Sequence, residues 1–417
     1  MAALFALLPL AAGLVFRTYT WGVSPRWFEA VRQLDLFYAA IEVAVIMFAR
    51  HRGLSYGLAL QRLPRDTRYV VIGFLATFWL GSAFVAGPVA YSMTRAMLWP
   101  IHILFGAALY HLRGASDAAA VRRFVLLLTL GYVAYFPMLA LHFLTAPEPS
   151  TVPGGAIIWT SALPGYLSVR HFGIETGATL ALLIGALWRD PAALHRRWLG
   201  FAAILLIGGA ACWSGTRAAM FGVAGAIIIT IVGRRIPPRT ATVVIVIAAL
   251  TLGGAVAQLI VPPNVSFGFR VAPPAYAAGG YTSGRVDLWI ASLRLFLERP
   301  LTGWGEGSAL WLITWNDVSF AHPHNTPLQM LESWGLPATL AALYLMARSW
   351  YALQHRGRGR SELLPILMAV DALLIMSLVD GVFFHARLVM MVAVMVVMGL
   401  RHAAPPAPFG SEDSGIA

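Results

Sequence analysis

The chain has 417 residues, of which 59% are hydrophobic and 12% are charged, and its formal net charge is +12. A soluble protein could not hide so much apolar surface in one core, so the composition indicates a membrane protein. All thirty basic residues are Arg, and most lie in short connections between apolar blocks, which is typical of encoded membrane topology and argues against nucleic acid as a partner. The single cysteine, Cys212, excludes an intramolecular disulfide and argues against a cysteine-based metal site.

Twelve apolar blocks follow one another, most of them close to the roughly 17–25 residues with which a helix crosses a bilayer. They comprise residues 2–16, 34–49, 69–86, 93–112, 122–144, 170–188, 198–214, 217–233, 240–261, 328–347, 362–380 and 387–400. The sequence therefore predicts an all-α polytopic membrane protein with about 12 transmembrane helices. The first block lacks a basic n-region and an evident cleavage site, so we expect it to be kept as a span.

The distribution of arginine predicts the orientation. The connections after even-numbered blocks, together with Arg401, hold nineteen Arg, whereas the connections after odd-numbered blocks hold eleven. Cytoplasmic loops carry the excess of basic residues, so both termini are expected in the cytoplasm, with Arg17, Arg26 and Arg32 as a mild exception. The predicted organisation is nine transmembrane helices in residues 1–261, a periplasmic loop in 262–327, three helices in 328–401 and a disordered cytoplasmic tail in 402–417.

The long external loop contains one predicted helix, at about residues 284–298. Its apolar side chains recur at spacings of three and four: Val286, Trp289, Leu293 and Phe296. Such a stripe suits a helix that lies along the membrane surface. A loop of this length in a compact membrane protein is usually functional.

The segment 323–329 carries the sharpest local pattern. Thr326 is expected to be a helix N-cap, Pro327 suits the first helical position, and Gln329 completes a capping box. His324 would then lie near the positive end of a helix, which disfavours the imidazolium and leaves a neutral ring, as a general base requires. The alternative is a histidine that only satisfies loop carbonyls.

Two arginines open helices on the predicted outer side. Arg217 follows a tight turn that carries the hydroxyls of Ser214 and Thr216, and the N–H groups of the next helix would add to an anion site. Arg285 opens the predicted surface helix in the same manner. The alternatives are an arginine that reaches lipid headgroups and a solvated helix end.

Weaker candidates lie near these residues. Glu332 is an ionisable group inside the tenth block, where it is costly and by default suspect. Asp380 and Arg387 share the last outer turn with His385, and a local salt bridge is the alternative there. The full set of weaker candidates is Arg170, His171, Ser214, Thr216, Asn325, Glu332, Asp380 and Arg387.

The acids of the outer side indicate a metal-free site. Asp287, Glu298, Glu306 and Asp317 form no D-x-D pair, and a divalent cation prefers paired carboxylates. Arginine is then the natural group for a phosphate-rich ligand, because its planar fork matches phosphate oxygens and stays charged. No cofactor is expected.

The sequence resembles the superfamily of O-antigen ligases and O-antigen polymerases. Three stretches carry the likeness: Ser214–Ala218; Gly284-Arg285 through Leu288-Trp289 with Arg299–Gly305 following; and Pro323-His324-Asn325 with Leu328, Glu332 and Gly335. The likeness covers mainly residues 165–390. The family's first motif more often reads Ser-x-Ser-Arg, and Thr216 stands here for the second serine but keeps a hydroxyl.

The resemblance implies a metal-independent glycosyltransferase of the GT-C-like class that uses a glycan on undecaprenyl pyrophosphate. In a ligase the acceptor is lipid A–core oligosaccharide, and the active site faces the periplasm of the bacterial inner membrane. Arg217 and Arg285 would bind the pyrophosphate and His324 would act as the catalytic base. We expect a ligase and keep three alternatives: a polymerase of lipid-linked repeats, a protein O-oligosaccharyltransferase, and a flippase or transporter suggested by the intramembrane acids Glu42, Glu175 and Asp371.

Overall fold

The computed structural model of the protein describes residues 36–84, 87–114, 117–145, 163–166, 169–190, 197–259, 285–315 and 318–402, together with positions 7, 10 and 11. Most of the first predicted block, the loop residues 262–284 and the predicted tail from residue 403 lie outside these ranges.

The described residues are almost entirely helical, in agreement with the predicted all-α class. The only strands within the described ranges are β1 (Thr314–Trp315) and β2 (Val318–Ser319), an antiparallel pair with Thr314 opposite Ser319. The helices are α4 (Leu36–His51), α5 (Tyr56–Gln61), α6 (Arg65–Phe84), α7 (Val89–Leu112), α8 (Ala118–Thr145), α9 (Val169–Leu187), α10 (Arg197–Trp213), α11 (Arg217–Ile228) with the π-helical continuation Ile229–Gly233, α12 (Thr240–Leu259), α13 (Arg285–Glu298), α14 (Ala309–Leu312), α15 (Thr326–Gly357), α16 (Leu364–Ser377) and α17 (Ala386–Leu400), with 3-10 turns at Ser361–Leu363 and Val382–Phe384.

Apolar helices support a membrane protein, although they do not establish twelve spans. By length and composition, three described helical segments could cross a bilayer: Arg65–Phe84, Ala118–Leu141 and Thr240–Leu259. Three shorter segments are also apolar: Arg197–Trp213, Arg217–Gly233 and Ala386–Leu400. The eleven apolar blocks after the first each coincide with a helix, but the number of spans stays a prediction.

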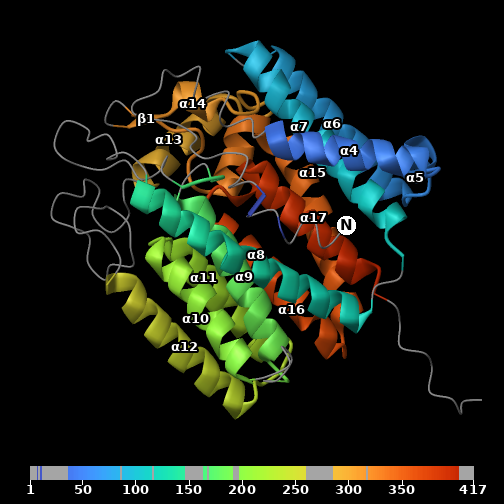
Figure 1. Cartoon of the computed structure of the whole chain (residues 1–417). Helices are drawn as coiled ribbons and strands as arrows, with labels where there is room; N and C mark the ends of the chain where they lie inside the picture. The colour runs from blue at the N-terminus through green and yellow to red at the C-terminus, as the bar shows by residue number, and fades with distance from the viewer. Residues whose placement is uncertain are drawn as a thin grey trace, which may run out of the picture.

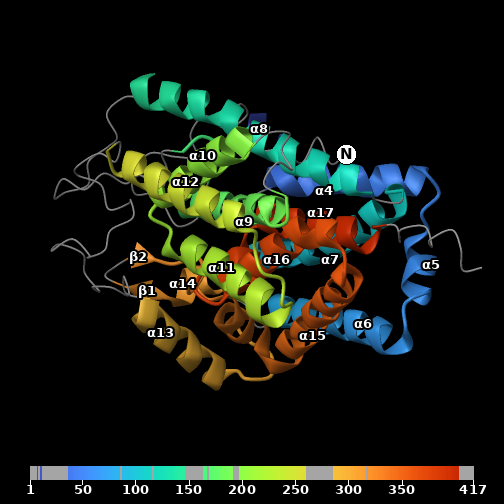
Figure 2. The same cartoon turned by 90° about the horizontal axis from the view of Figure 1, so that it is seen from below.

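Helices α9 and α16 form the centre of the bundle. Residues 172–185 of α9 and 364–373 of α16 are buried without interruption, because both helices are apolar on every side. Helix α9 packs against α10, α11 and α16, and α16 also contacts α15 and α17. Figures 1 and 2 show α9 to α12 on one side of α16 and α17, and α6 and α15 on the other.

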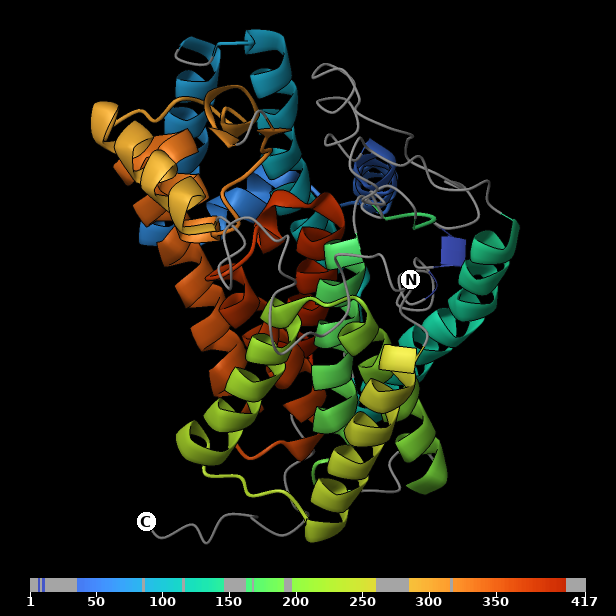
Figure 3. The same ribbon diagram turned by 90° about the vertical axis from the view of Figure 1, so that its left-hand side faces the viewer.

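One end of the bundle carries the elements of the predicted external loop. Figures 1 and 2 place α13, α14 and the two strands at one end and α5 at the other, and in Figure 3 α13 and α14 (orange) face the viewer. Helix α13 occupies the segment predicted to be helical and contacts α15. Its buried Leu288 packs with Ala309 of α14 and with Ile313, and it exposes Val286, Ile290, Leu293 and Leu297. The exposed apolar stripe thus differs from the predicted one, since Trp289 and Phe296 are half-buried.

Candidate active site

His324 lies in the loop that enters α15, and its backbone adopts the left-handed conformation with φ 54°. The helix N-cap is Asn325, whose side-chain oxygen accepts a hydrogen bond from the N–H of Leu328 at 2.9 Å. The predicted N-cap at Thr326 is therefore wrong. Thr326 is already helical, and its hydroxyl donates to the carbonyl of Asp380 instead.

Asp380 is the partner of the His324 imidazole. Its Oδ1 lies 2.9 Å from Nδ1 of His324 and also accepts the N–H of Gly381, and its Oδ2 lies 3.3 Å from Nη2 of Arg285. Burial alone would raise the pKa of Asp380, but His324 and Arg285 hold it well below its usual range. The carboxylate is therefore ionised near neutral pH, so Nδ1 of His324 carries a proton toward it, and in the neutral form of the ring Nε2 has the free lone pair.

Two guanidinium groups lie beside this pair, and a third lies beside one of them. Nη1 of Arg285 donates to the carbonyl of Val379 at 2.6 Å, which fixes the side chain at the end of α16. Arg170, in the first turn of α9, lies close enough to Arg217, Arg285 and Asp380 to interact electrostatically with all three. Arg217 and Arg285, predicted as a pyrophosphate grip, are thus both neighbours of Arg170, and Arg285 also contacts the His324–Asp380 pair.

The turn before Arg217 packs directly on the start of α9. Ser214 donates its hydroxyl hydrogen to the carbonyl of Ala211 and lies 2.9 Å from the hydroxyl of Thr216. The Thr216 hydroxyl lies 3.5 Å from the carbonyl of Arg170. A Cβ at Gly173 would collide with both hydroxyls, so the turn can approach α9 only because residue 173 is glycine. Both candidate hydroxyls therefore belong to the packing of the turn.

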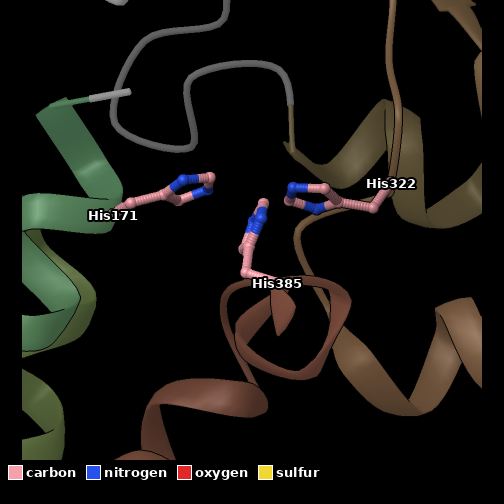
Figure 4. Close-up of side chains that lie close together, drawn as sticks. All are labelled: His171, His322 and His385. Carbon is pink, nitrogen blue, oxygen red and sulfur yellow. The ribbon is translucent and has the colours of Figure 1, made fainter. Parts of the chain in front are cut away.

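A cluster of imidazoles adjoins the site. Ring nitrogens of His171, His322 and His385 lie within 4.8 Å of one another, and Figure 4 shows the three rings pointing toward a common centre from three separate elements. Burial first, and then the neighbouring imidazole (His324 for one ring and His171 for the other), hold the pKa values of His322 and His385 well below the usual range. His322 was not among the predicted site residues, although it lies two residues before His324.

The segment after α13 interrupts α15. Gly335 has φ 71° and ψ 177°, so α15 is two helices joined at this residue. The N–H groups of Trp304 and Gly305 donate to the carbonyls of Glu332 and Ser333 at 2.9 and 2.8 Å. Backbone groups freed by the break are thus satisfied by the chain at residues 304 and 305, as a break at membrane depth requires.

Two weaker candidates lie in buried networks. Nε of Arg387 lies 2.6 Å from Oε1 of Glu175, and its other nitrogens donate to the hydroxyls of Tyr38 and Tyr166. Glu332 is fully buried and accepts the hydroxyl hydrogen of Ser308 at 2.8 Å. The local salt bridge considered for the last outer turn is not formed, because Arg387 pairs with Glu175 and Asp380 with His324 and Arg285.

Comparison with known families bears on the predicted resemblance. Residues 201–343 match the family model described as O-antigen ligase. This match supports the predicted resemblance to the O-antigen ligase and polymerase superfamily. No curated protein matches it. Members of this superfamily carry out glycosyl transfer. The matched segment contains Arg217, Arg285 and His324. Four other residues near the site lie outside the matched segment: Arg170, His171, Asp380 and His385.

Proposed function

We propose that the protein is an O-antigen ligase that transfers a glycan from undecaprenyl pyrophosphate to lipid A–core oligosaccharide at the periplasmic face of the inner membrane. The observation that carries this proposal is that Arg285 and Arg170 lie beside the His324–Asp380 pair and that Arg217 lies beside Arg170. Cations for a pyrophosphate and a base for a hydroxyl are the two groups that such a transfer needs.

The arginines serve the donor. The periplasm has no nucleotide pool, so the glycan must arrive on an activated carrier, and a prenyl pyrophosphate leaves with stabilised negative charge. Arg217 and Arg285 bind the pyrophosphate oxygens, and Arg170 adds a third positive charge beside them. Their charge neutralises the negative charge that grows on the bridging oxygen as its bond to the sugar C1 breaks.

His324 serves the acceptor. Its Nε2 takes the proton of the acceptor hydroxyl while the hydroxyl oxygen forms a new bond to C1, and undecaprenyl pyrophosphate departs with the electron pair of the old C1–O bond. Asp380 holds Nδ1–H and stabilises the imidazolium that results. A direct displacement of this kind inverts the anomeric carbon. The arginines supply the positive charge at the pyrophosphate, so we propose a metal-independent reaction.

Two other functions have support. The family match covers polymerases as well as ligases, so joining of lipid-linked repeats is the enzymatic alternative. A flippase or transporter predicts charged pairs deep in the bundle. Two carboxylate–arginine pairs are present, Glu175 with Arg387 and Asp371 with Arg234, and Glu42 pairs with the imidazole of His102. The family match and the His324–Asp380 pair favour transfer over transport.

Two experiments test the proposal. In lipopolysaccharide from a deletion strain, loss of a ligase leaves bare core while polymer accumulates on its carrier, whereas loss of a polymerase leaves core with a single repeat. In membranes with matched protein levels, His324→Ala should lower glycan transfer by about 10²-fold or more. Full activity in that variant would remove His324 as the base.

A further inference from the structure

The backbone of His324 needs support. Its φ of 54° lies in a sparsely populated region, and among the described residues only Arg235 shares a positive φ without being glycine. Such conformations persist where surrounding groups hold them, and they gather at functional sites. The proposed base is therefore positioned by an unusual backbone, and its neighbours should show what holds it.

His322 is the neighbour that contacts this backbone. Its Nδ1 accepts the N–H of His324 at 3.2 Å, and its ring packs edge-on against the His324 ring with centroids 4.5 Å apart. Phe384 covers it at a centroid distance of 4.9 Å. A Cβ at Gly381 would collide with three atoms of the His322 ring, so glycine at 381 makes the place for this imidazole.

The hydrogen bond determines where the proton of His322 lies. An Nδ1 that accepts an N–H is unprotonated, so a neutral ring carries its hydrogen on Nε2. Burial and the adjacent His324 hold the pKa of His322 well below its usual range, which keeps the ring neutral. Within the described part of the chain, the buried Nδ1 of His385 has no hydrogen-bond partner, and it lies in the cluster toward which the His322 ring points (Figure 4).

The same geometry disfavours a metal ion in the cluster. Three imidazoles suit Zn²⁺, but an ion needs the lone pair of each bound nitrogen, and Nε2 of His322 carries hydrogen in the neutral ring. The rings of His171 and His385 have centroids only 3.3 Å apart. Two imidazoles on one zinc ion stand roughly 5 Å apart, given bonds of about 2.0–2.1 Å.

We propose that His322 is a positioning residue for the glycan transfer: its Nδ1 clamps the left-handed backbone of His324, and the His171–His385 pair lies on the side of its Nε2–H. This inference rests on the proposed function, in which His324 is the base. His322 itself takes no proton from the acceptor.

The first test removes and then restores the atom of residue 322 that accepts the backbone N–H of His324. His322→Ala should lower kcat by about 10–100-fold with little change in KM for the donor, because a misplaced base costs that much. His322→Asn offers an amide oxygen near the place of Nδ1 and should recover at least tenfold of the loss, with the pH profile of the wild type. The inference is overturned if kcat of His322→Asn is as low as that of His322→Ala, or if the pH dependence of its kcat differs from that of the wild type. Either result would indicate that His322 transfers a proton.

The second test is a double-mutant cycle. Gly381→Ala should push the His322 ring aside and lower kcat by about tenfold or more, whereas in the His322→Ala background the added methyl group has room and should change kcat less than threefold. Gly106→Ala, at a helical glycine with no atom within 4 Å, is the control and should keep wild-type activity. Additive losses in the cycle would contradict the clamp.

These outcomes separate this inference from the proposed function. Wild-type activity in His324→Ala would remove the base itself, whatever His322 does. Wild-type activity in His322→Ala together with an inactive His324→Ala would overturn only the clamp. All variants are compared in membranes at equal protein level, with thermal unfolding in detergent as the check on folding.

Discussion

At the scale of single residues, the two nitrogens of His324 have different surroundings. Nδ1 faces the ionised carboxylate of Asp380, and Nε2 is left to meet an acceptor. The same carboxylate touches Arg285 through its other oxygen. Asp380 therefore couples the acceptor side of the proposed reaction to the donor side.

Replacing this carboxylate tests the coupling. Asp380→Asn should lower kcat by roughly 10²-fold or more, because the amide neither fixes the tautomer of His324 nor stabilises its imidazolium. The measurement is transfer rate in membranes at equal protein level. Asp371→Asn is the matched control: Asp371 is also buried and paired with arginine, but with Arg234. The prediction is contradicted if both variants lose activity only to the extent that each loses folded protein.

Arginine should not be replaceable by lysine at the donor side. Arg285 uses two nitrogens at once, one to the carbonyl of Val379 and one to Asp380, and an ammonium group cannot reproduce that fork. Arg285→Lys and Arg217→Lys should each lower kcat/KM by about tenfold or more. Arg348→Lys, at an exposed pair with Asp66, is the control and should have no effect. Near-normal rates in the site variants would exclude a forked phosphate grip.

Part of the site could be predicted residue by residue. Arg217, Arg285 and His324 belong to short motifs that mark helix starts, so local patterns indicated them. The partner of His324 could not be found in this way, because Asp380 is 56 residues away in sequence and its contact depends on packing of α15 beside α16. The local salt bridge considered for Asp380 and Arg387 was wrong for the same reason.

At the scale of elements, the break in α15 at Gly335 shapes the entrance of the helix. Gly303 and Gly335 both have positive φ, and a Cβ on either would meet the backbone of the other segment at 2.5–2.8 Å. The chain at 299–305 and the first turns of α15 are thus held by main-chain contact. The sequence patterns predicted one continuous helix here and did not predict the break, because a single glycine within an apolar block fits a continuous helix equally well.

A pair of glycine substitutions tests the break. Gly335→Ala should destabilise the protein by about 1–3 kcal/mol more than Gly359→Ala, because overpacking adds to the strain of the backbone. Gly359 is a matched control, since it has the same φ of 71° but no atom within 4 Å. Thermal unfolding in detergent measures the difference. Equal shifts would show that the contact with residues 301–303 does not matter.

The ion pair between α17 and α9 should be structural. Arg387→Met leaves the carboxylate of Glu175 buried and unpaired, which costs about 3–5 kcal/mol, so the yield of folded protein should fall sharply. Adding Glu175→Gln removes the stranded charge and should restore both yield and transfer activity. If folded double variant stays inactive, Arg387 contacts a substrate instead.

At the scale of the whole molecule, α15 lies between the loop that carries His324 and an arginine-rich connection. Residues 336–357 form a helix of about 33 Å, enough for a hydrocarbon core of about 30 Å. His324 precedes its outer end, and the arginine-rich connection at 356–360 follows its inner end. The excess of arginine therefore predicts that the proposed active site lies on the periplasmic face.

Cysteine labelling tests this orientation. In a Cys212→Ala background, Thr302→Cys should react with a membrane-impermeant maleimide in spheroplasts, whereas Ser361→Cys should react only after lysis. Both positions are exposed, so access to the reagent is comparable. Labelling of both positions from the same side would contradict the predicted topology.

The most direct test of the account is glycan transfer by the purified, reconstituted protein with a defined lipid-pyrophosphate glycan, in chelator, with and without lipid A–core. We expect transfer that depends on the lipid A–core acceptor, persists in chelator, and falls by about 10²-fold or more in His324→Ala. Transfer that stops in chelator, or that survives unchanged in His324→Ala, would contradict an arginine and histidine site.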